Sequence, residues 1–165
     1  MACAAPRGAF GVSDDGIGGW RRALAESQRR GKTTTAMKDG LVPGVQREVS
    51  FVVEDSMSPI FEGRQVHRVC ATWTLVHYME LAGRLVLIDF LDDDEEGVGS
   101  HVSCDHLTPA PVGSTVRVEA TARDVTDREL VCDVVAMRGS HVVATGRTVQ
   151  KVFPRAVLKR ILHEA

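Results

Sequence analysis

Residues 71–91 read ATWTLVHYMELAGRLVLIDFL, and on a helical wheel this segment is apolar on nearly every side. A run of this kind predicts one long helix that is buried by the structure around it. Arg84 and Asp89 interrupt its most apolar part, so it falls short of the roughly 18 uncharged residues that a membrane-spanning helix needs. The segment therefore predicts a soluble protein, without a membrane partner, whose core forms around a single helix.

Five segments around this helix have the alternating or β-branched composition of strands. One precedes the helix and four follow it: Val45–Glu54, Gly99–Leu107, Thr115–Asp124, Glu129–Met137 and His141–Phe153. The alternation is clearest in the third of them, where Val116, Val118, Ala120 and Ala122 fall on one face. That face is predicted to be buried.

The segments between these elements carry helix and strand breakers or charge. Ser56–Val69 is predicted to be irregular, because Pro59 and Gly63 interrupt any periodic pattern. The acidic run DDDEE at residues 92–96 is expected to be a solvated loop whose charge resists burial.

A hairpin turn is predicted at residues 138–140 (RGS), and Pro154 is expected to open a short C-terminal amphipathic helix. One strand, one long helix and four consecutive strands indicate an α+β fold, with an antiparallel five-stranded sheet wrapped around one helix. This order of elements matches the hotdog fold. Such a sheet leaves an edge and one face partly unsatisfied, so a homodimer is expected.

The length of 165 residues suits one domain, and 20 basic against 22 acidic side chains give a net charge of −2. This near-neutral balance argues against a nucleic-acid partner. Residues 1–36 differ from the rest, since they carry six basic and three acidic groups and too few apolar residues for a core. We expect 1–36 to be a flexible leader that is not necessarily part of the native chain, and 37–165 to form the domain.

The cysteines, at positions 3, 70, 104 and 132, form no CxxC pair, which argues against a structural zinc site and favours reduced thiols in the cytoplasm. His77 and Glu80 stand three apart on the helix, a spacing that can bind metal. A single such pair is usually ordinary helix-surface chemistry. No metal or other cofactor is therefore expected.

Three residues are candidates for chemistry. Glu80 lies within the apolar helix, where an unpaired carboxylate costs several kcal/mol or takes up a proton, and its ordinary role would be a salt bridge to Arg84. Thr72 lies eight residues earlier on the same helix face and would ordinarily cap the helix. A helix start also offers free N–H groups to a developing oxyanion. His106, at a strand end, would ordinarily be a hydrogen-bonded edge residue.

Two stretches together resemble a known family. VCATWTLVHYMELA (69–82) and GSHVSCDHLTPAPVG (99–113) resemble the fluoroacetyl-CoA thioesterase family of hotdog proteins, and the match extends over about 37–153. Its specific part is a threonine, a glutamate eight residues later, and a histidine seven residues after a glycine. The resemblance implies that Thr72, Glu80 and His106 are catalytic and that Gly99 lines the site.

The activity that the resemblance implies is hydrolysis of short or medium acyl-CoA thioesters, without a metal or prosthetic group. In that chemistry Glu80 is a base or nucleophile, Thr72 orients the thioester or accepts the acyl group, and His106 assists at the carbonyl. Direct hydrolysis and an acyl-enzyme both remain open. The alternative from another class is a non-catalytic acyl-CoA binding protein on the same fold, because fold alone does not determine function.

The chain departs from the family in two places. Fluoroacetyl-specialised members carry a phenylalanine-rich lid before the helix, where this chain has Gly63 and Val66, and Val66 is expected to contact substrate. They also place an arginine in the last long strand, where Gln150 is the nearest equivalent. We therefore expect little preference for fluoroacetyl-CoA over acetyl-CoA.

Overall fold

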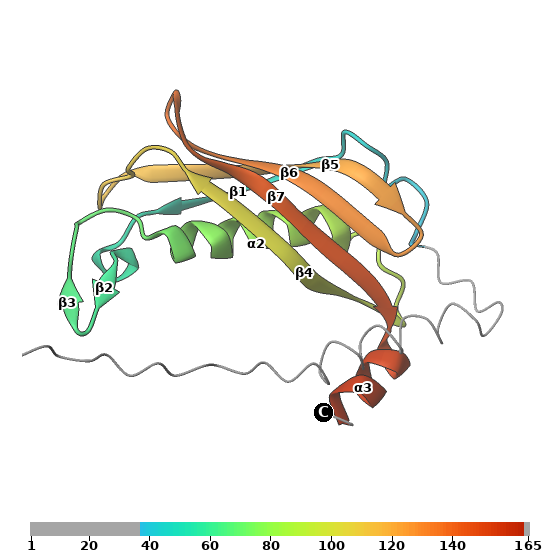
Figure 1. Ribbon diagram of the computed structural model, residues 1–165. Coiled ribbons are helices and arrows are strands. Elements are labelled where there is room, and N and C mark those ends of the chain that lie inside the picture. Colours follow the sequence, from blue (N-terminus) through green and yellow to red (C-terminus); the bar gives the residue numbers. More distant parts are fainter. Residues whose placement is uncertain (1–36, 164–165) are drawn as a thin grey trace, which may run out of the picture. The chain divides into compact units, whose positions relative to one another are not determined.

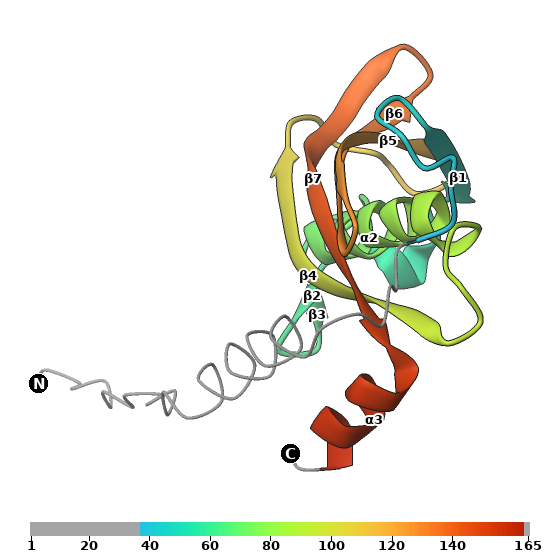
Figure 2. The same ribbon diagram turned by 90° about the vertical axis from the view of Figure 1, so that its right-hand side faces the viewer.

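The computed structural model describes residues 37–163, and the predictions made for residues 1–36 lie outside that range. Its central element is helix α2 (Thr72–Ile88), which lies across the concave face of a five-stranded sheet (Figure 1). A view turned by 90° shows the strands curving around the helix (Figure 2). The predicted α+β arrangement, one long helix wrapped by an antiparallel sheet, is confirmed.

All five strands run antiparallel to their neighbours, in the order β1-β5-β6-β7-β4. Their bounds are Gln46–Val52 for β1, Glu95–His106 for β4, Thr115–Thr126 for β5, Glu129–Arg138 for β6 and His141–Pro154 for β7. β4 follows the helix in sequence but pairs with β7, so it becomes one edge of the sheet, and β1 becomes the other. The outer edge of β4 has no partner strand within residues 37–163.

The predicted face of β5 is buried as expected. Val116, Val118, Ala120 and Ala122 are each at most 2% exposed and belong to one core with the buried face of the helix. Their alternate neighbours Thr115 and Arg117 are exposed. The period of two seen in the sequence therefore corresponds to a sheet with one face on the core.

Helix α2 is buried along one face rather than nearly all round. Its buried residues are Leu75, Met79, Ala82, Gly83, Val86 and Leu87. Trp73 and Ile88 are about half exposed, at 49% and 47%. The prediction of an all-round buried helix was wrong because, in the described part of the chain, the sheet covers only one side of it.

Close packing of the helix on the sheet depends on Gly83. A methyl group at this position would lie 2.2 Å from Oγ1 of Thr148 on β7. Thr148 is itself buried, at 1% exposure. Only glycine therefore lets the helix lie this close to the centre of the sheet.

Residues 56–69, predicted to be irregular, contain a small hairpin. A 3₁₀ turn, η1 (Asp55–Met57), leads into β2 (Ile60–Phe61) and β3 (Arg64–Gln65), which pair antiparallel. Glu62 and Gly63 connect them with φ angles of 51° and 76°. Positive φ at both turn positions is what a two-residue type I′ turn requires. The sequence pattern missed it because Glu-Gly is not among the usual turn pairs.

The acidic run is only partly a solvated loop, so that prediction needs correction. β4 begins at Glu95, inside the run, and Glu95 is fully buried. Its Oε2 accepts a hydrogen bond of 3.1 Å from the backbone N–H of Asp92, which closes the turn before the strand. Burial is tolerated because this bond partly replaces the lost hydration.

β7 ends at Pro154, and helix α3 (Arg155–His163) follows directly, as predicted from the proline. α3 projects from the end of the sheet and buries none of its residues (Figure 1). No helix within residues 37–163 is long and apolar enough to cross a membrane.

We expect Gly83→Ala to lower the free energy of unfolding by about 1–3 kcal/mol, because the added methyl group forces the helix away from Thr148. The measurement is urea unfolding followed by circular dichroism. The free energy of unfolding of the Gly83→Ala, Thr148→Ala double variant should fall by less than the sum of the two single changes, since the second substitution removes the clashing group. Wild-type stability in Gly83→Ala would show that the helix does not approach the sheet this closely.

Candidate active site

The structure brings Thr72 and His106 into direct contact. Thr72 is the first residue of α2 and His106 is the last residue of β4, and these two ends lie side by side in both views (Figures 1 and 2). The Thr72 hydroxyl Oγ1 lies 3.0 Å from Nδ1 of His106. A hydroxyl within hydrogen-bond reach of an imidazole is the arrangement of a nucleophile beside its base.

The contact of the second ring nitrogen of His106 determines which group donates in this hydrogen bond. Nε2 lies 3.1 Å from the carbonyl oxygen of Thr108. A carbonyl oxygen only accepts, so in the neutral imidazole Nε2 carries the proton and Nδ1 is the acceptor. The Thr72 hydroxyl then donates to His106. Thr108 is in turn held on β7, because its Oγ1 donates to the carbonyl oxygen of Val142 at 2.7 Å.

Thr72 does not cap the helix, although capping is the usual role of a threonine at a helix start. The N-cap position belongs to Ala71, and no side chain caps this helix end. Among residues 37–163, the backbone N–H groups of Thr72 and Trp73 have no acceptor, whereas those of Thr74 and Leu75 donate to the carbonyl of Ala71. Two free N–H groups therefore stand beside the Thr72 hydroxyl, as an oxyanion site requires.

Glu80 lies against Gly99 of β4. A methyl group at Gly99 would lie 2.0 Å from Oε1 of Glu80, so the glycine makes room for the carboxylate. In the described part of the chain this carboxylate makes no hydrogen bond or ion pair. Gly99, predicted to line the site, thus touches one of the predicted catalytic groups.

Arg84 is not the partner of Glu80. Its guanidinium donates to Oε1 of Glu96 at 2.8 Å and to the carbonyl oxygen of Gly97 at 2.9 Å. The hydrogen bond from Arg84 is the main reason why the pKa of the Glu96 carboxyl is lowered. The i,i+4 salt bridge within the helix is therefore replaced by one to the neighbouring strand, and Glu80 is left for another role.

Glu80 and the Thr72–His106 pair occupy two separate places in one subunit. Eight residues along a helix correspond to about 12 Å, and seven residues along β4 separate Gly99 from His106 by about 23 Å. The three predicted residues therefore form two groups, Thr72 with His106 and Glu80 with Gly99.

Comparison with known proteins identifies the family of this chain. The family model of FlK, the fluoroacetyl-CoA-specific thioesterase, matches residues 53–156. This chain belongs to that family. No curated protein sequence matched the chain.

Solved structures show the same relationship. A thioesterase superfamily member from Thermus thermophilus is 33% identical, with a TM-score of 0.74, over 76% of this chain and 93% of its own. The fluoroacetyl-CoA thioesterase FlK itself is 25% identical, with a TM-score of 0.70, over 76% of this chain and 98% of its own. A hot-dog-like protein from Thermanaerovibrio acidaminovorans, 21% identical with a TM-score of 0.68 over 74% and 90%, shares the fold. The predicted hotdog thioesterase family is thus confirmed.

In this family member the hairpin before the helix does carry an aromatic ring. Phe61 of β2 meets Trp73, next to Thr72, edge to face with ring centroids 5.7 Å apart. Phe61 is 60% exposed and Val66 is 50% exposed. Sequence reasoning considered Gly63 and Val66 and missed Phe61. The period of a two-residue strand is too short to reveal which side chain faces the helix.

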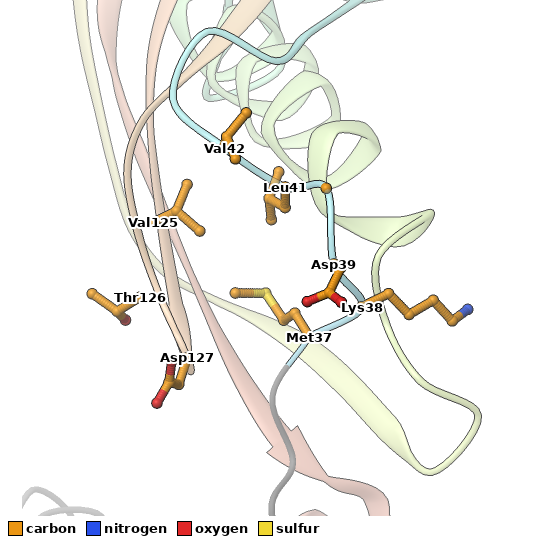
Figure 3. A pocket seen from close by; sticks show the side chains of 9 residues that line it. Met37, Lys38, Asp39, Leu41, Val42, Val125, Thr126 and Asp127 are labelled. Carbon is orange, nitrogen blue, oxygen red and sulfur yellow. The ribbon is translucent and has the colours of Figure 1, made fainter.

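A pocket of about 310 Å³ opens elsewhere, between residues 37–42 and the turn that joins β5 to β6 (Figure 3). Figure 3 shows Met37 and Val125 on opposite sides of it. Here the N–H of Lys38 donates to the carbonyl oxygen of Phe90, beyond the C-terminal end of α2. The pocket is therefore at the far end of the helix from Thr72, and no predicted site residue lines it. Residues 37–163 contain no group of three metal-ligating side chains.

We expect His106 to be the tautomer with a proton on Nε2 and none on Nδ1, because Nε2 faces a carbonyl oxygen. Two-bond proton–nitrogen correlation spectra of the neutral imidazole distinguish the two tautomers. Thr72→Val should keep this tautomer, since the bond to Thr108 is untouched. A proton found on Nδ1 would mean that Thr72 accepts from the ring and is not activated by it.

Proposed function

We propose that this protein is an acyl-CoA thioesterase that hydrolyses short or medium acyl-CoA thioesters with Thr72, His106 and Glu80. The observation that carries the proposal is the hydrogen bond of 3.0 Å between the Thr72 hydroxyl and Nδ1 of His106, with the ring oriented by the carbonyl of Thr108. Membership of a thioesterase family supports the reaction class. We propose a cytoplasmic location, which the free thiols of Cys70 and Cys104 support.

In the first step we propose that Oγ1 of Thr72 attacks the thioester carbonyl carbon while its proton passes to Nδ1 of His106. The oxygen of the tetrahedral intermediate is stabilised by the free N–H groups of Thr72 and Trp73. The carbon–sulfur bond then breaks, and CoA leaves as the thiol after taking the proton from His106. The products of this step are free CoA and an acyl ester on Thr72.

In the second step Glu80 acts as general base on a water molecule that attacks the ester carbonyl. The water oxygen joins the acyl carbon, its proton goes to Glu80, and the ester bond to Thr72 breaks. The proton held by Glu80 passes to Oγ1 of Thr72 as the carboxylic acid leaves, so both groups return to their starting state. The absence of any partner for Glu80 among the described residues leaves its carboxylate available for this water.

The separation of Glu80 from Thr72 supports a homodimer in which each site uses both subunits. Among the strands of residues 37–163 none pairs with the outer edge of β4, and residues 97–106 of it contain neither proline nor lysine, the residues that usually protect an edge from pairing. A two-fold antiparallel pairing centred near Val102 and Ser103 would place Gly99, with its Glu80, opposite His106 of the partner subunit. The same pairing would bury the edge.

The substrate side of the site is proposed to include Gly99 and Val66. Gly99 leaves room for the Glu80 carboxylate beside the strand, where the acyl group would lie. Val66 and the rings of Phe61 and Trp73 present an apolar surface at the start of the helix. Such a surface discriminates weakly between fluorine and hydrogen, so we propose no strong preference for fluoroacetyl-CoA.

We expect the purified protein to release CoA from acetyl-CoA and from a panel of short and medium acyl-CoAs, fluoroacetyl-CoA included. Glu80→Gln and His106→Ala should each lower kcat at least about 100-fold, because each removes an acid–base group. In Glu80→Gln the acyl ester should accumulate on Thr72, seen as the mass of one acyl group on the intact protein. Thiol release, measured with a chromogenic reagent, follows the turnover.

The matched control is Glu119→Gln, which removes an exposed carboxylate on β5 and should leave turnover unchanged. Tight binding of acyl-CoA, seen as a raised melting temperature without CoA release, would identify a binding protein instead. Full turnover in Thr72→Ala would contradict the acyl-enzyme and favour direct attack of water.

We expect Glu80→Gln and His106→Ala subunits to complement one another. A heterodimer of the two variants contains one site with both changes and one site with neither, so it should recover about half of the wild-type turnover per dimer. Differently tagged subunits, coexpressed and purified through both tags, provide the heterodimer. If Glu80 and His106 act within one subunit, every site carries one lesion and no turnover returns. A monomer in light scattering would also contradict the shared site.

A further inference from the structure

The carboxamide of Gln150 is buried near Glu80. Gln150 of β7 is 2% exposed, and its Oε1 is buried without any hydrogen-bond partner in the described part of the chain. It lies between Thr148 and Val152 on the face of β7 that turns toward the helix, a position at which apolar residues are the rule. A buried polar group that is not fully bonded calls for an explanation other than packing.

The surroundings of Gln150 identify what its two ends face. Gly99 is its direct neighbour across the β4–β7 pair. The place where a Gly99 methyl group would stand lies 2.0 Å from Oε1 of Glu80 and 3.5 Å from Nε2 of Gln150. The corresponding place at Gly97 lies 3.7 Å from Oε1 of Gln150 and 3.7 Å from Nη1 of Arg84.

The carboxamide thus lies between a carboxylate and a guanidinium, with its NH₂ end toward Glu80 and its oxygen toward Arg84. Turning the amide over would direct its oxygen at a carboxylate and its NH₂ group at a cation, both of which are unfavourable. Arg84 is anchored by Glu96 and the carbonyl of Gly97, so a held positive charge lies on the side of the oxygen end. Within residues 37–163, the Glu80 carboxylate is an unpaired acceptor on the same side as the NH₂ end.

We propose that Gln150 is a positioning residue: its Nε2, which makes no hydrogen bond to Glu80 in the described structure, donates to the Glu80 carboxylate in the working site and holds it against Gly99 in the orientation that activates water. The proposal for Gln150 rests on the proposed function, because Gln150 has this role only if Glu80 is the base. Gln150 touches neither the acyl carbon nor CoA in this role. Its effect is confined to the step in which Glu80 takes a proton.

The test is Gln150→Met, which keeps the length of the side chain and removes both polar atoms. We expect kcat to fall about 10- to 100-fold through misplacement of Glu80, with KM for acetyl-CoA changed less than about threefold. The burst of CoA in the first turnover should keep its rate, because Thr72 and His106 are untouched, and acyl-enzyme should accumulate. Folding should survive, since the change removes an unbonded buried oxygen.

A double-variant comparison separates positioning from other roles. Glu80→Gln with Gln150→Met should be no slower than Glu80→Gln alone, because Gln150 acts through Glu80. The matched control is Thr148→Val, which removes the other buried unbonded oxygen on the same face of β7 and should leave kcat unchanged.

If the losses of kcat add in the double variant, or if Gln150→Met raises KM, Gln150 contacts substrate and the proposal is overturned. Unchanged kcat in Gln150→Met would also overturn it and identify a packing residue. If Glu80→Gln itself keeps its turnover, the proposed function fails at Glu80, a result that is distinct from failure at Gln150 alone.

Discussion

The close approach of helix α2 to the sheet is the constraint on which the rest of the structure depends. At Gly83, Gly97 and Gly99 a methyl group would lie within 2.6 Å of Thr148, Leu87 and Glu80 respectively, so a side chain at Gly83 would push helix and sheet apart and one at Gly97 or Gly99 would displace the side chain that lies on it. Interiors packed at crystal-like density cannot absorb such a change without shifting a whole element. Because the helix lies this close to the sheet, the partly buried Glu80 lies against Gly99 of β4, and Thr72 at the helix start lies beside His106 at the end of the same strand.

The same geometry divides the proposed catalytic residues into two groups, Glu80 and the Thr72–His106 pair. A rigid helix carries Thr72 and Glu80 about 12 Å apart, a distance that no rotamer change closes. β4 contacts both, since Gly99 receives Glu80 and His106 receives Thr72. β4 touches both groups and has no partner strand on its outer edge within the described residues, so it is suited to bring Glu80 of a neighbouring copy to Thr72 and His106. In our proposal, catalysis and dimer formation therefore depend on one element, and a change that disturbs the β4 edge would affect both.

Elements with a strong local pattern could be predicted from the sequence, and contacts between distant segments could not. The alternation in residues 115–124 and the proline at 154 identify β5 and the start of α3, because their causes lie within a few residues. Arg84 was assigned to Glu80 since they stand four apart on a helix, yet the fold offers it Glu96 from another strand. Glu95 was assigned to solvent on its charge alone, yet a local bond to Asp92 permits its burial. Thr72, Glu80 and His106 were selected by family resemblance, and only the structure shows that two of them meet.

Gln150 illustrates what the alternation of residues along a strand predicts and what it does not predict. Residues 148, 150 and 152 alternate onto the core face of β7, so the sequence already places a carboxamide where an aliphatic side chain would be more stable. An unbonded buried polar oxygen costs about 1–3 kcal/mol, which is a large share of the stability of a small domain. Thr148 carries the same penalty beside Gly83, where the hydroxyl occupies the space that the helix leaves. Gln150 has a different setting, between Glu80 and Arg84. There the charges match both ends of the amide, and in our proposal the cost of burying Gln150 is offset by the positioning of the Glu80 carboxylate.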